Sequence, residues 1–429
     1  TVIERAPLVG GLAGCVEHNG NRYEFGTHVL HTDQPELRKR VLDLMGDRMF
    51  SFDRGSRLEI KFRDRYYPFP LNGIQVMRNL PPGLSLSCIL SFVKWLIILM
   101  LKRDGPKSTE EYLELHFGRK LYEVFFKDYT RKFWGVPCSE LDPRFGQERI
   151  PRSDVVRVFH DLVGFLGLQK MIDRHPLVER SIGKLYYTSN GLQVMFQTIA
   201  DKITSNGGRV ITGATAVEVN VKAGAFNGVR IETVRGEETI AGDYLISSIP
   251  ITTLSQIMSP SPPPNVLGSA NQLRYLPLKV CGLLINRKSV RNSICTYYRD
   301  KIFNRLSEPT THGLLTAPPG KCIVLAEMTP CSIEQCGISS EEHIRAAVID
   351  DMAKEGLIHA EDVLDSVILD YDAAYPVYLL GYRKHLDRCL NYIGSLKNAR
   401  SVGRQGQFVY VNIHITMKMG CEAAREVDN

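Results

Sequence analysis

The interpretation of this chain starts from VIERAPLVGGLAG, residues 2–14, where a short apolar strand ends in an acid and a glycine turn follows. In a dinucleotide-binding βαβ unit, an acid at the end of the second strand binds the ribose hydroxyls. Adjacent glycines let backbone N–H groups approach a pyrophosphate because no Cβ intervenes. Glu4 alone would also suit an exposed strand end, but its spacing to Gly10 and Gly11 favours a dinucleotide site.

The glycine-rich loop of such a unit, G-x-G-x-x-G, lies between the first strand and the acid-bearing strand. Here it would lie before residue 1. The chain opens at Thr1 without a methionine or a charged and apolar leader. We therefore expect an N-terminally truncated Rossmann-like unit, in which the first strand and its glycine loop are missing.

The composition limits the class of protein. The 429 residues are 44% hydrophobic and 23% charged, which predicts a globular chain long enough for two domains. The net charge of +6 forms no Lys/Arg block, so nucleic acid is not an expected partner. Ten cysteines occur without a C-x-x-C pair, so neither a zinc site nor a disulfide framework is indicated, and no metal ligand is assigned. These features favour a reducing cytoplasm.

Two stretches near the N-terminus resemble flavoproteins. ERAPLVGGLAG, residues 4–14, is similar to the E-x(5)-GG signature of the FAD-dependent amine-oxidase-like superfamily. YEFGTHVLHT, residues 23–32, resembles the G-x-H-x-x-H-T stretch of UDP-galactopyranose mutases and the FGGH stretch of protoporphyrinogen-oxidase-like proteins. The resemblance implies that FAD is the cofactor and that Gly26 and His28 lie beside its flavin, where a neutral imidazole can donate or accept. Without the resemblance, a surface or core position would be favoured for His28.

A third stretch, FGRKLYEVFFKDYTRKFWG at residues 117–135, resembles the helix and turn that line the substrate pocket of the mutases. The resemblance implies that Tyr129 and Trp134 act as catalytic residues and offer flat, amphipathic faces to the substrate. A simpler interpretation also fits this stretch. Tyr122, Phe125 and Tyr129 recur at helical spacing, as the residues of a buried stripe do.

The most specific stretch is SVGRQGQFVYVN, residues 401–412, which resembles the flavin motif G-R-x-G-x-F-x-Y-x-N-M-D. It implies that the next helix directs its N-terminus at the flavin, where N–H groups and the helix dipole stabilise negative charge. His414 stands where the motif has Asp, so a residue suited to N-capping is replaced by one that caps poorly. The residues assigned to FAD are Glu4, Gly10, Gly11, Gly26, Val217, Gly403, Arg404, Gly406, Tyr410 and Asn412.

The order of the patterns predicts a discontinuous α/β fold. Helical periodicity extends from about Asn79 to Ile182, including Ser153–Ile172, and Asp243–Ile249 is predicted as a buried strand. A Rossmann-like FAD-binding domain is assigned to residues 1–72, 185–255 and 395–429. A helical and mixed α+β substrate domain is assigned to residues 73–184 and 256–394, and the cofactor would lie between the pieces.

The resemblances imply an enzyme but leave its reaction open. Asp243–Pro250 is similar to protoporphyrinogen-oxidase-like proteins, and no motif matches the arginines with which the mutases bind a sugar nucleotide. Hydride transfer from a small-molecule substrate to flavin N5 is therefore the first hypothesis. A mutase-like reaction on a sugar nucleotide is the second. A truncated, non-catalytic chain that does not hold FAD is the third.

The segment from Leu84 to Leu101 predicts a long apolar helix. It contains one charged residue, Lys94, and is followed by Lys102 and Arg103. A membrane span needs about 20 apolar residues, and a charge inside it is costly. The alternatives are a buried core helix and a helix that lies on a membrane surface. Peripheral membrane contact therefore stays among the expectations for this otherwise cytoplasmic protein.

Overall fold

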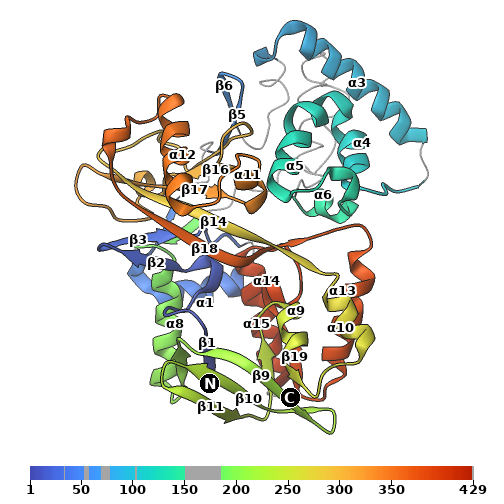
Figure 1. Cartoon of the computed structure of the whole chain (residues 1–429), viewed down its shortest axis with the longest axis vertical. Helices are drawn as coiled ribbons and strands as arrows, with labels where there is room; N and C mark the ends of the chain where they lie inside the picture. Colours follow the sequence, from blue (N-terminus) through green and yellow to red (C-terminus); the bar gives the residue numbers. More distant parts are fainter. Residues whose placement is uncertain (33, 53–57, 69–77, 102–103, 150–184, 428–429) are drawn as a thin grey trace.

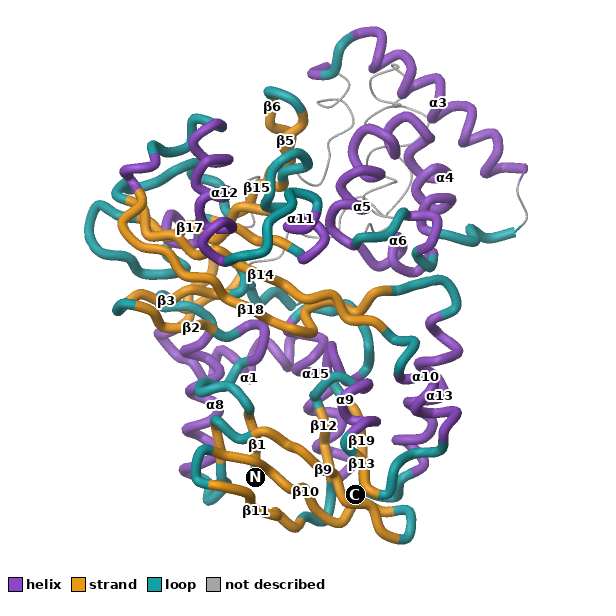
Figure 2. The backbone as a smooth tube through the Cα atoms, viewed as in Figure 1, coloured by secondary structure: helices purple, strands orange, loops and turns teal. Residues whose placement is uncertain are grey.

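The computed structural model describes residues 1–32, 34–52, 58–68, 78–101, 104–149 and 185–427. Two long strands, β14 (Arg274–Ile285) and β18 (Val363–Val377), pair in antiparallel fashion and cross the middle of the molecule (Figure 2). Above this pair, Figure 1 shows a group of helices beside further strands, and below the pair it shows small sheets together with other helices. Segments that are distant in sequence therefore meet at the middle of the molecule.

The lower part of Figure 1 contains the Rossmann-like elements. Four short strands make parallel pairs, β1 (Val2–Glu4) with β8 (Val210–Thr212) and β12 (Leu245–Ser247) with β19 (Ala399–Ser401). Another small sheet has the order β11 (Gly236–Ala241), β10 (Ala225–Thr233), β9 (Thr215–Lys222) and β13 (Met258–Ser259). Parallel pairs need long connections, which here contain the rest of the chain. These elements confirm the predicted α/β fold class, whereas the predicted domain bounds stay a prediction.

A seven-stranded sheet forms the centre of the upper part. Beside β18 and β14 it contains, in order, β17 (Cys322–Met328), β16 (Arg305–Ser307), β15 (Cys295–Tyr297), β5 (Leu58–Phe62) and β6 (Arg65–Pro68). Successive side chains of a strand point to opposite faces. Along β14, Leu278, Val280 and Leu284 pack into one core, and Cys281 and Leu283 pack into another. The strand is therefore buried on both faces and holds the two parts of the molecule together.

Four helices form a layer beside this sheet: α3 (Pro82–Leu101), α4 (Thr109–Leu121), α5 (Asp128–Trp134) and α6 (Pro143–Arg149). The backbone N–H of Glu111 donates to Ser108 Oγ at 3.2 Å, which caps α4. A π-helical turn, Tyr122–Lys127, joins α4 to α5. Gly135 ends α5 with φ of 71°, a left-handed conformation that favours glycine, so the chain turns away directly after Trp134.

The predicted apolar helix is α3, whereas the predicted helix Ser153–Ile172 and the predicted domain bounds near residues 72 and 184 lie outside the described residues. The remaining α-helices and strands are β2 (Cys15–His18), β3 (Asn21–Glu24), α1 (Pro35–Met45), β4 (Met49–Phe52), β7 (Leu185–Thr188), α8 (Gln193–Ser205), α9 (Ile251–Gln256), α10 (Pro264–Ala270), α11 (Pro330–Glu334), α12 (Glu341–Lys354), α13 (Tyr382–Ser395), α14 (Gly403–Gly406) and α15 (Ile413–Val427).

One predicted strand differs from the structure. Asp243–Ile249 was expected to be a buried strand, but only Leu245–Ser247 are extended in β12, and Ile246 is 42% exposed. Both Leu245 and Ile246 line a large cavity, and of the two only Leu245 also packs against a core. The prediction was wrong because an apolar run indicates a strand but does not show whether protein atoms cover it.

Candidate active site

A cavity of about 2760 Å³ opens between the two parts of the molecule. Its lining includes residues 1–17, residues of α5, and side chains that follow β15 and β19. All three predicted catalytic residues and most of the predicted cofactor residues line this cavity. Gly26, Val217 and Gly406 are not part of the lining. The four predicted motifs therefore meet at one place, although they are up to 400 residues apart in the sequence.

The first end of the cavity contains the acid and the glycine turn. Glu4 lines the cavity, and one of its carboxylate oxygens accepts from the Ala6 N–H at 2.8 Å. Gly10 has φ of 123°, and a Cβ there would lie 2.8 Å from the Phe196 ring. Only glycine fits such a position, so no Cβ covers the backbone of the turn at residue 10. The arrangement fits a ribose and a diphosphate.

His28 lies further along the wall with its side chain partly buried. Burial lowers the pKa of His28 to about 3, and the charges of Arg305 and Arg404 act in the same direction. The imidazole is therefore neutral. Its Nδ1 and the neighbouring Thr27 Oγ1 are buried, and neither has a hydrogen-bond partner among the described residues. Both atoms are available for a ligand in the cavity.

Val217, which was assigned to the cofactor, does not line the cavity. It lies in β9, where Ala216 and Val219 line the cavity instead.

An ion pair supports this wall from behind. Arg305 Nε donates to Glu327 Oε1 at 2.7 Å, and Ser307 Oγ donates to the same oxygen at 3.1 Å. Burial opposes the charge of Arg305, but the Glu327 carboxylate outweighs this effect and keeps the arginine pKa well above its usual value. Gly26 passes over the pair with φ of 121°, and a Cβ there would lie 2.8 Å from Glu327 Oε1. Gly26 thus makes room for the pair instead of lining the cavity.

Two further arginines surround one tyrosine ring. The guanidinium carbon of Arg149 lies 3.8 Å from the centroid of the Tyr410 ring, and that of Arg404 lies 4.1 Å from it. The Tyr375 ring stacks on Tyr410 with centroids 5.3 Å apart and planes 8° apart. Burial raises the pKa of Tyr410, but the charges of Arg149, Arg404 and Arg305 outweigh burial and lower the pKa below its usual value. This part of the wall is strongly positive.

The two arginines differ from the other charged residues of the wall in their partners. Glu148 lines the same cavity, where burial raises the pKa of its carboxyl group and the charge of Arg149 counters this effect. Neither Arg149 nor Arg404 forms an ion pair with another described residue, and the buried Nε and Nη2 atoms of Arg404 have no acceptor there. Buried polar groups are normally hydrogen-bonded, and charged ones normally meet an opposite charge. An anion in the cavity would supply the acceptor that these Arg404 atoms lack among the described residues.

The helix α5 supplies the aromatic side of the site. Tyr129, Phe133 and Trp134 all line the cavity. Tyr129 lies edge-on to Tyr297 at 6.1 Å, and Trp134 lies edge-on to Phe145 at 4.8 Å. Trp134 is also buried in the main core. Trp134 is therefore part of the core and also lines the cavity, whereas its catalytic role stays a prediction.

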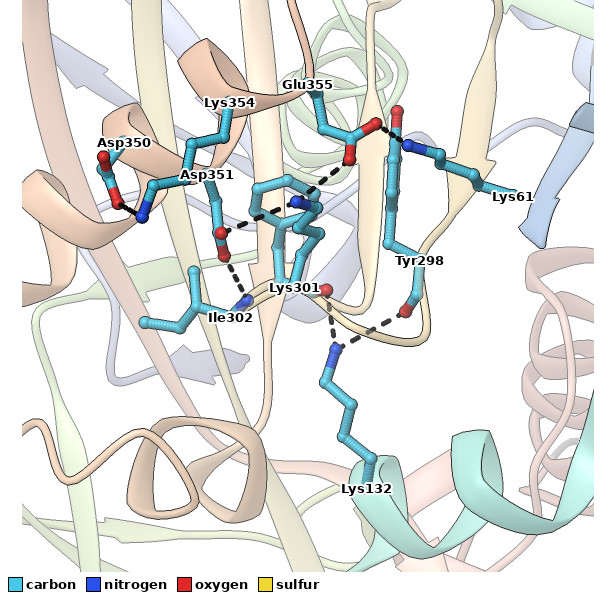
Figure 3. A network of polar contacts seen from close by, with 10 residues as sticks. Lys61, Lys132, Tyr298, Lys301, Ile302, Asp350, Asp351, Lys354 and Glu355 are labelled. Atoms are coloured by element: carbon cyan, nitrogen blue, oxygen red, sulfur yellow. Dashed lines mark hydrogen bonds and ion pairs between the residues drawn. The ribbon is translucent and has the colours of Figure 1, made fainter. Parts of the chain in front are cut away.

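A polar network fixes α5 against the strands that carry Tyr297 and Arg305 (Figure 3). Lys132 Nζ donates to the carbonyl oxygens of Phe303 at 2.9 Å and Tyr298 at 3.4 Å. Burial lowers the pKa of Lys132 to about 8. From the other side, Asp351 of α12 accepts from the Ile302 N–H at 2.7 Å. The loop between β15 and β16 is thereby held between two helices, and α5 is positioned with it.

The C-terminal end of the site differs from the prediction at the helix cap. The helix α15 begins at Ile413, and the Asn412 carbonyl accepts from the backbone N–H groups of Ile415 and Thr416. Asn412, not His414, therefore occupies the cap position, and His414 lies inside the first turn with its ring 4.6 Å from that of His31. The expected loss of an N-cap through His414 was wrong because the helix starts one residue before it. Gly403 and Asn412 line the cavity, whereas Gly406 is buried where a Cβ would lie 2.7 Å from Ser401 Oγ.

Sequence analysis did not identify Arg149 and Arg305 as site residues. Each is one of 53 basic residues, in a stretch with no recognised motif, so no local signal distinguished it. Both reach the site through contacts between distant elements. In contrast, Arg404 and Tyr410 were predicted from a motif, because the loop that carries them is a continuous stretch of sequence.

The residues present fit FAD. The bare glycine turn and Glu4 at one end suit the adenosine and diphosphate, while Arg404, Thr27 and His28 offer buried polar atoms that have no other described partner. The described ranges contain no group of three or more His, Cys, Asp or Glu side chains that could hold a metal ion. Among the described residues, no helix has both the length and the apolar character needed to cross a bilayer.

Comparisons with known proteins agree with this site. The model of the family described as flavin containing amine oxidoreductase matches residues 1–376. A crystal structure of reduced UDP-galactopyranose mutase superposes with a TM-score of 0.80 at 19% identity, covering 99% of this chain and 89% of that chain. A variant of putrescine oxidase gives 0.63 at 13% identity, covering 100% and 92%. An oxidoreductase from Methanosarcina mazei gives 0.60 at 14% identity, covering 99% and 93%. At such identities these structures share the fold.

Proposed function

The chain belongs to the flavin-containing amine oxidoreductase family and is an FAD-dependent oxidoreductase, and we propose that its substrate is a small anionic molecule oxidised by hydride transfer to flavin N5. The observation that carries the anionic substrate is the pair Arg149 and Arg404 at the Tyr410 ring, where Nε and Nη2 of Arg404 are buried without an acceptor among the described residues. Two like charges held close together favour the binding of an anion between them.

The two arginines have different positions in the fold. Arg404 follows β19, in the stretch that resembles the flavin motif, and we assign it to the cofactor. Arg149 ends α6, which belongs to the same helical layer as α5, and we assign it to the substrate. Tyr129 and Trp134 would then contact the substrate from α5. This division places the anion of the substrate at the aromatic side of the cavity.

When bound, FAD supplies the electron-accepting ring. The chain supplies orientation through Arg149 and an apolar wall that excludes water, formed by Tyr129, Phe133 and Tyr375. His28 remains neutral at physiological pH, because its pKa of about 3 lies far below this range. Its imidazole can therefore donate or accept a hydrogen bond without adding charge to the site. The positive end of α15 and Arg404 favour negative charge beside the cofactor.

The first experiment tests cofactor and substrate together. The purified protein is expected to be yellow and to show the flavin absorbance bands. Under anaerobic conditions, we would follow the loss of this absorbance with pairs of reduced small molecules that differ only in a carboxylate or phosphate against an amide or alcohol. We expect the anionic member of each pair to react faster. A colourless preparation that takes up no FAD would contradict the assignment as a flavoenzyme.

A matched pair of variants isolates the role of Arg149. We expect Arg149→Gln to reduce the preference for the anionic substrate about tenfold or more, because a hydrogen bond to a charged group is lost. Arg144→Gln changes an exposed arginine of the same helix and is expected to leave this preference unchanged. Equal preferences in the two variants would show that the substrate anion binds elsewhere.

A mutase-like reaction on a sugar nucleotide is the second candidate. The observation in its favour is that Arg149, Arg305 and Arg404 all line the cavity, although no stretch of the sequence matches the arginines with which the mutases bind a sugar nucleotide. The test is incubation of the dithionite-reduced protein with UDP-galactopyranose. Formation of the furanose isomer would replace hydride transfer as the proposed reaction, whereas unchanged sugar nucleotide, together with flavin bleaching by an anionic substrate, would support our first proposal.

A further inference from the structure

The outer face of α3 exposes a stripe of apolar side chains. Leu86, Leu90, Val93 and Ile97 are each between 43 and 62% exposed. Their spacing of four, three and four residues places them on one side of the helix. Ten large apolar side chains are exposed in the described part of the chain, and four of them lie on this stripe. Such a concentration marks an interaction surface, because isolated exposed apolar residues are common but contiguous groups are not.

Packing against α4 fixes which face of α3 points outward. Gly118 of α4 has φ of 74°, and a Cβ there would lie 2.8 Å from the backbone N and Cα atoms of Phe92. The Lys120 N–H donates to Ser91 Oγ at 3.2 Å. Cys88 and Phe92 point inward and are almost fully buried. The stripe is therefore held outward by tertiary contacts on the opposite face.

Basic side chains accompany the stripe. Lys94 is exposed on α3 itself. At the N-terminal end, Arg65 donates to the Asn79 carbonyl at 3.2 Å, three residues before the helix, and both Arg65 and Arg78 are exposed. One acid, Asp64, lies beside Arg65. In the sequence, α3 is followed by Lys102 and Arg103. The charge near this helix is thus mainly positive.

Figure 1 shows α3 at the outer rim of the molecule, away from the central strands and with α4 on its inner side. An apolar stripe with adjacent basic side chains is the pattern of a helix that lies in the headgroup region of a membrane. The basic residues are complementary to anionic lipids, with about 1 kcal/mol per Lys or Arg near such a surface. A neutral apolar partner surface would leave them without a counterpart.

We propose that α3 docks this protein on the surface of an anionic lipid bilayer, with Leu86, Leu90, Val93 and Ile97 in the apolar boundary and the basic residues at the headgroups. This surface is separate from the cavity, because none of the four side chains lines it. The proposal is therefore independent of the reaction that the enzyme catalyses.

The test is cosedimentation of the flavin-loaded protein with vesicles of phosphatidylcholine alone or mixed with phosphatidylserine. We expect binding to the mixed vesicles, weaker binding at high salt because the charges are screened, and little binding to phosphatidylcholine. The double variant Leu86→Ser and Leu90→Ser is expected to bind the mixed vesicles about a hundredfold less, since both leucines lose their burial in the apolar boundary. The matched control is Leu364→Ser with Leu380→Ser, two leucines exposed by 46 and 51% outside α3.

Three results would overturn the proposal. One is an absence of vesicle binding by the unmodified protein. Another is equal loss of binding in the test and control variants. The last is an unmodified protein that sediments as a dimer in free solution and becomes a monomer in the α3 variant without binding lipid, which would assign the stripe to a second copy of the chain. Circular dichroism of both double variants would establish that they remain folded.

Discussion

In most proteins, charged side chains face water and apolar side chains are buried. The cavity wall and the outer face of α3 both differ from this rule, the first with buried charges and the second with exposed apolar side chains. The wall holds Arg149 and Arg404 against tyrosine rings, with no ion pair to an acid among the described residues. The face of α3 holds four apolar side chains in solvent. Folding alone favours neither arrangement, because charges prefer water or a counter-charge and apolar groups prefer burial. Both regions are therefore expected to bind a partner, an anion at the cavity wall and an apolar surface at α3.

The two regions differ in how much folding stability depends on them. The wall is connected to a buried ion pair and to carbonyl groups of a fixed loop, so changes there leave buried charges or acceptors without partners. The stripe of α3 faces outward and is about half exposed, so changes there remove fewer contacts with the rest of the chain. This difference can be measured with single and double variants.

The largest expected effect follows from removal of a carboxylate behind the wall. Glu327→Gln leaves Arg305 in a mostly buried position without its counter-charge, which should lower the free energy of unfolding by about 3 kcal/mol. Chemical denaturation would measure this loss. Glu237→Gln breaks an exposed pair with Arg230 and is the control, with an expected change under about 1 kcal/mol. Equal losses in both variants would show that the Arg305 site is as well solvated as a surface pair.

The next effect concerns the arginine at the cofactor. Arg404→Gln should weaken FAD binding about tenfold or more, because hydrogen bonds to charged groups contribute about 1.5 to 3 kcal/mol. Titration of the apoprotein with FAD, followed by flavin fluorescence, measures the dissociation constant. Arg400→Gln changes a neighbouring arginine that pairs with Glu426 at the surface and should bind FAD normally. Unchanged affinity in Arg404→Gln would remove this residue from the cofactor site.

A smaller effect should appear as a pH dependence of stability. The folded state lowers the pKa of Lys132 from 10.5 to about 8, so between these values the unfolded chain binds more protons than the folded one. Burial of the charged lysine opposes folding below about pH 8, and this opposition is relieved as the pH rises toward 10.5. The unmodified protein should therefore gain stability relative to Lys132→Met over this range.

Thermal unfolding at several pH values would test the Lys132 prediction. The control is Lys397→Met, because Lys397 is exposed and its replacement removes no buried charge. A constant difference between the unmodified protein and Lys132→Met from pH 8 to 10 would contradict the prediction. It would mean that the ammonium group is well solvated despite its two carbonyl partners.

The smallest effect is expected on the face of α3. In the absence of lipid, the double variant Leu86→Ser and Leu90→Ser should unfold within about 0.5 kcal/mol of the unmodified protein, as exposed substitutions usually do. Chemical denaturation under the conditions used for Glu327→Gln gives a direct comparison. A loss as large as that of Glu327→Gln would show that the stripe is part of a packed core. The free energy of unfolding would then depend on the two regions to the same extent.

Parts of the site were predictable because they depend on short stretches of sequence. Glu4 and the turn at Gly10 lie within seven residues, and the turn has a backbone conformation that favours glycine. Arg404, Tyr410 and Asn412 lie on one loop before α15 and were found together. Arg149 and Arg305 were not predictable, since α6 and β16 come next to that loop only through the packing of the sheet and helices. The N-cap of α15 was predicted at His414 but is formed by Asn412, because the helix begins at Ile413.

By itself, the sequence determined the α/β class, the acid and glycine turn at the start of the cavity, and a long apolar helix near Leu84–Leu101. The tertiary structure decided that three arginines meet around one cavity. It also decided that Phe92 packs on Gly118 while Leu86 and Leu90 face outward. The physical reason is the range of the forces involved. Backbone preferences and side-chain periodicity act over a few residues, whereas the burial of a face and the meeting of distant charges depend on contacts between whole elements.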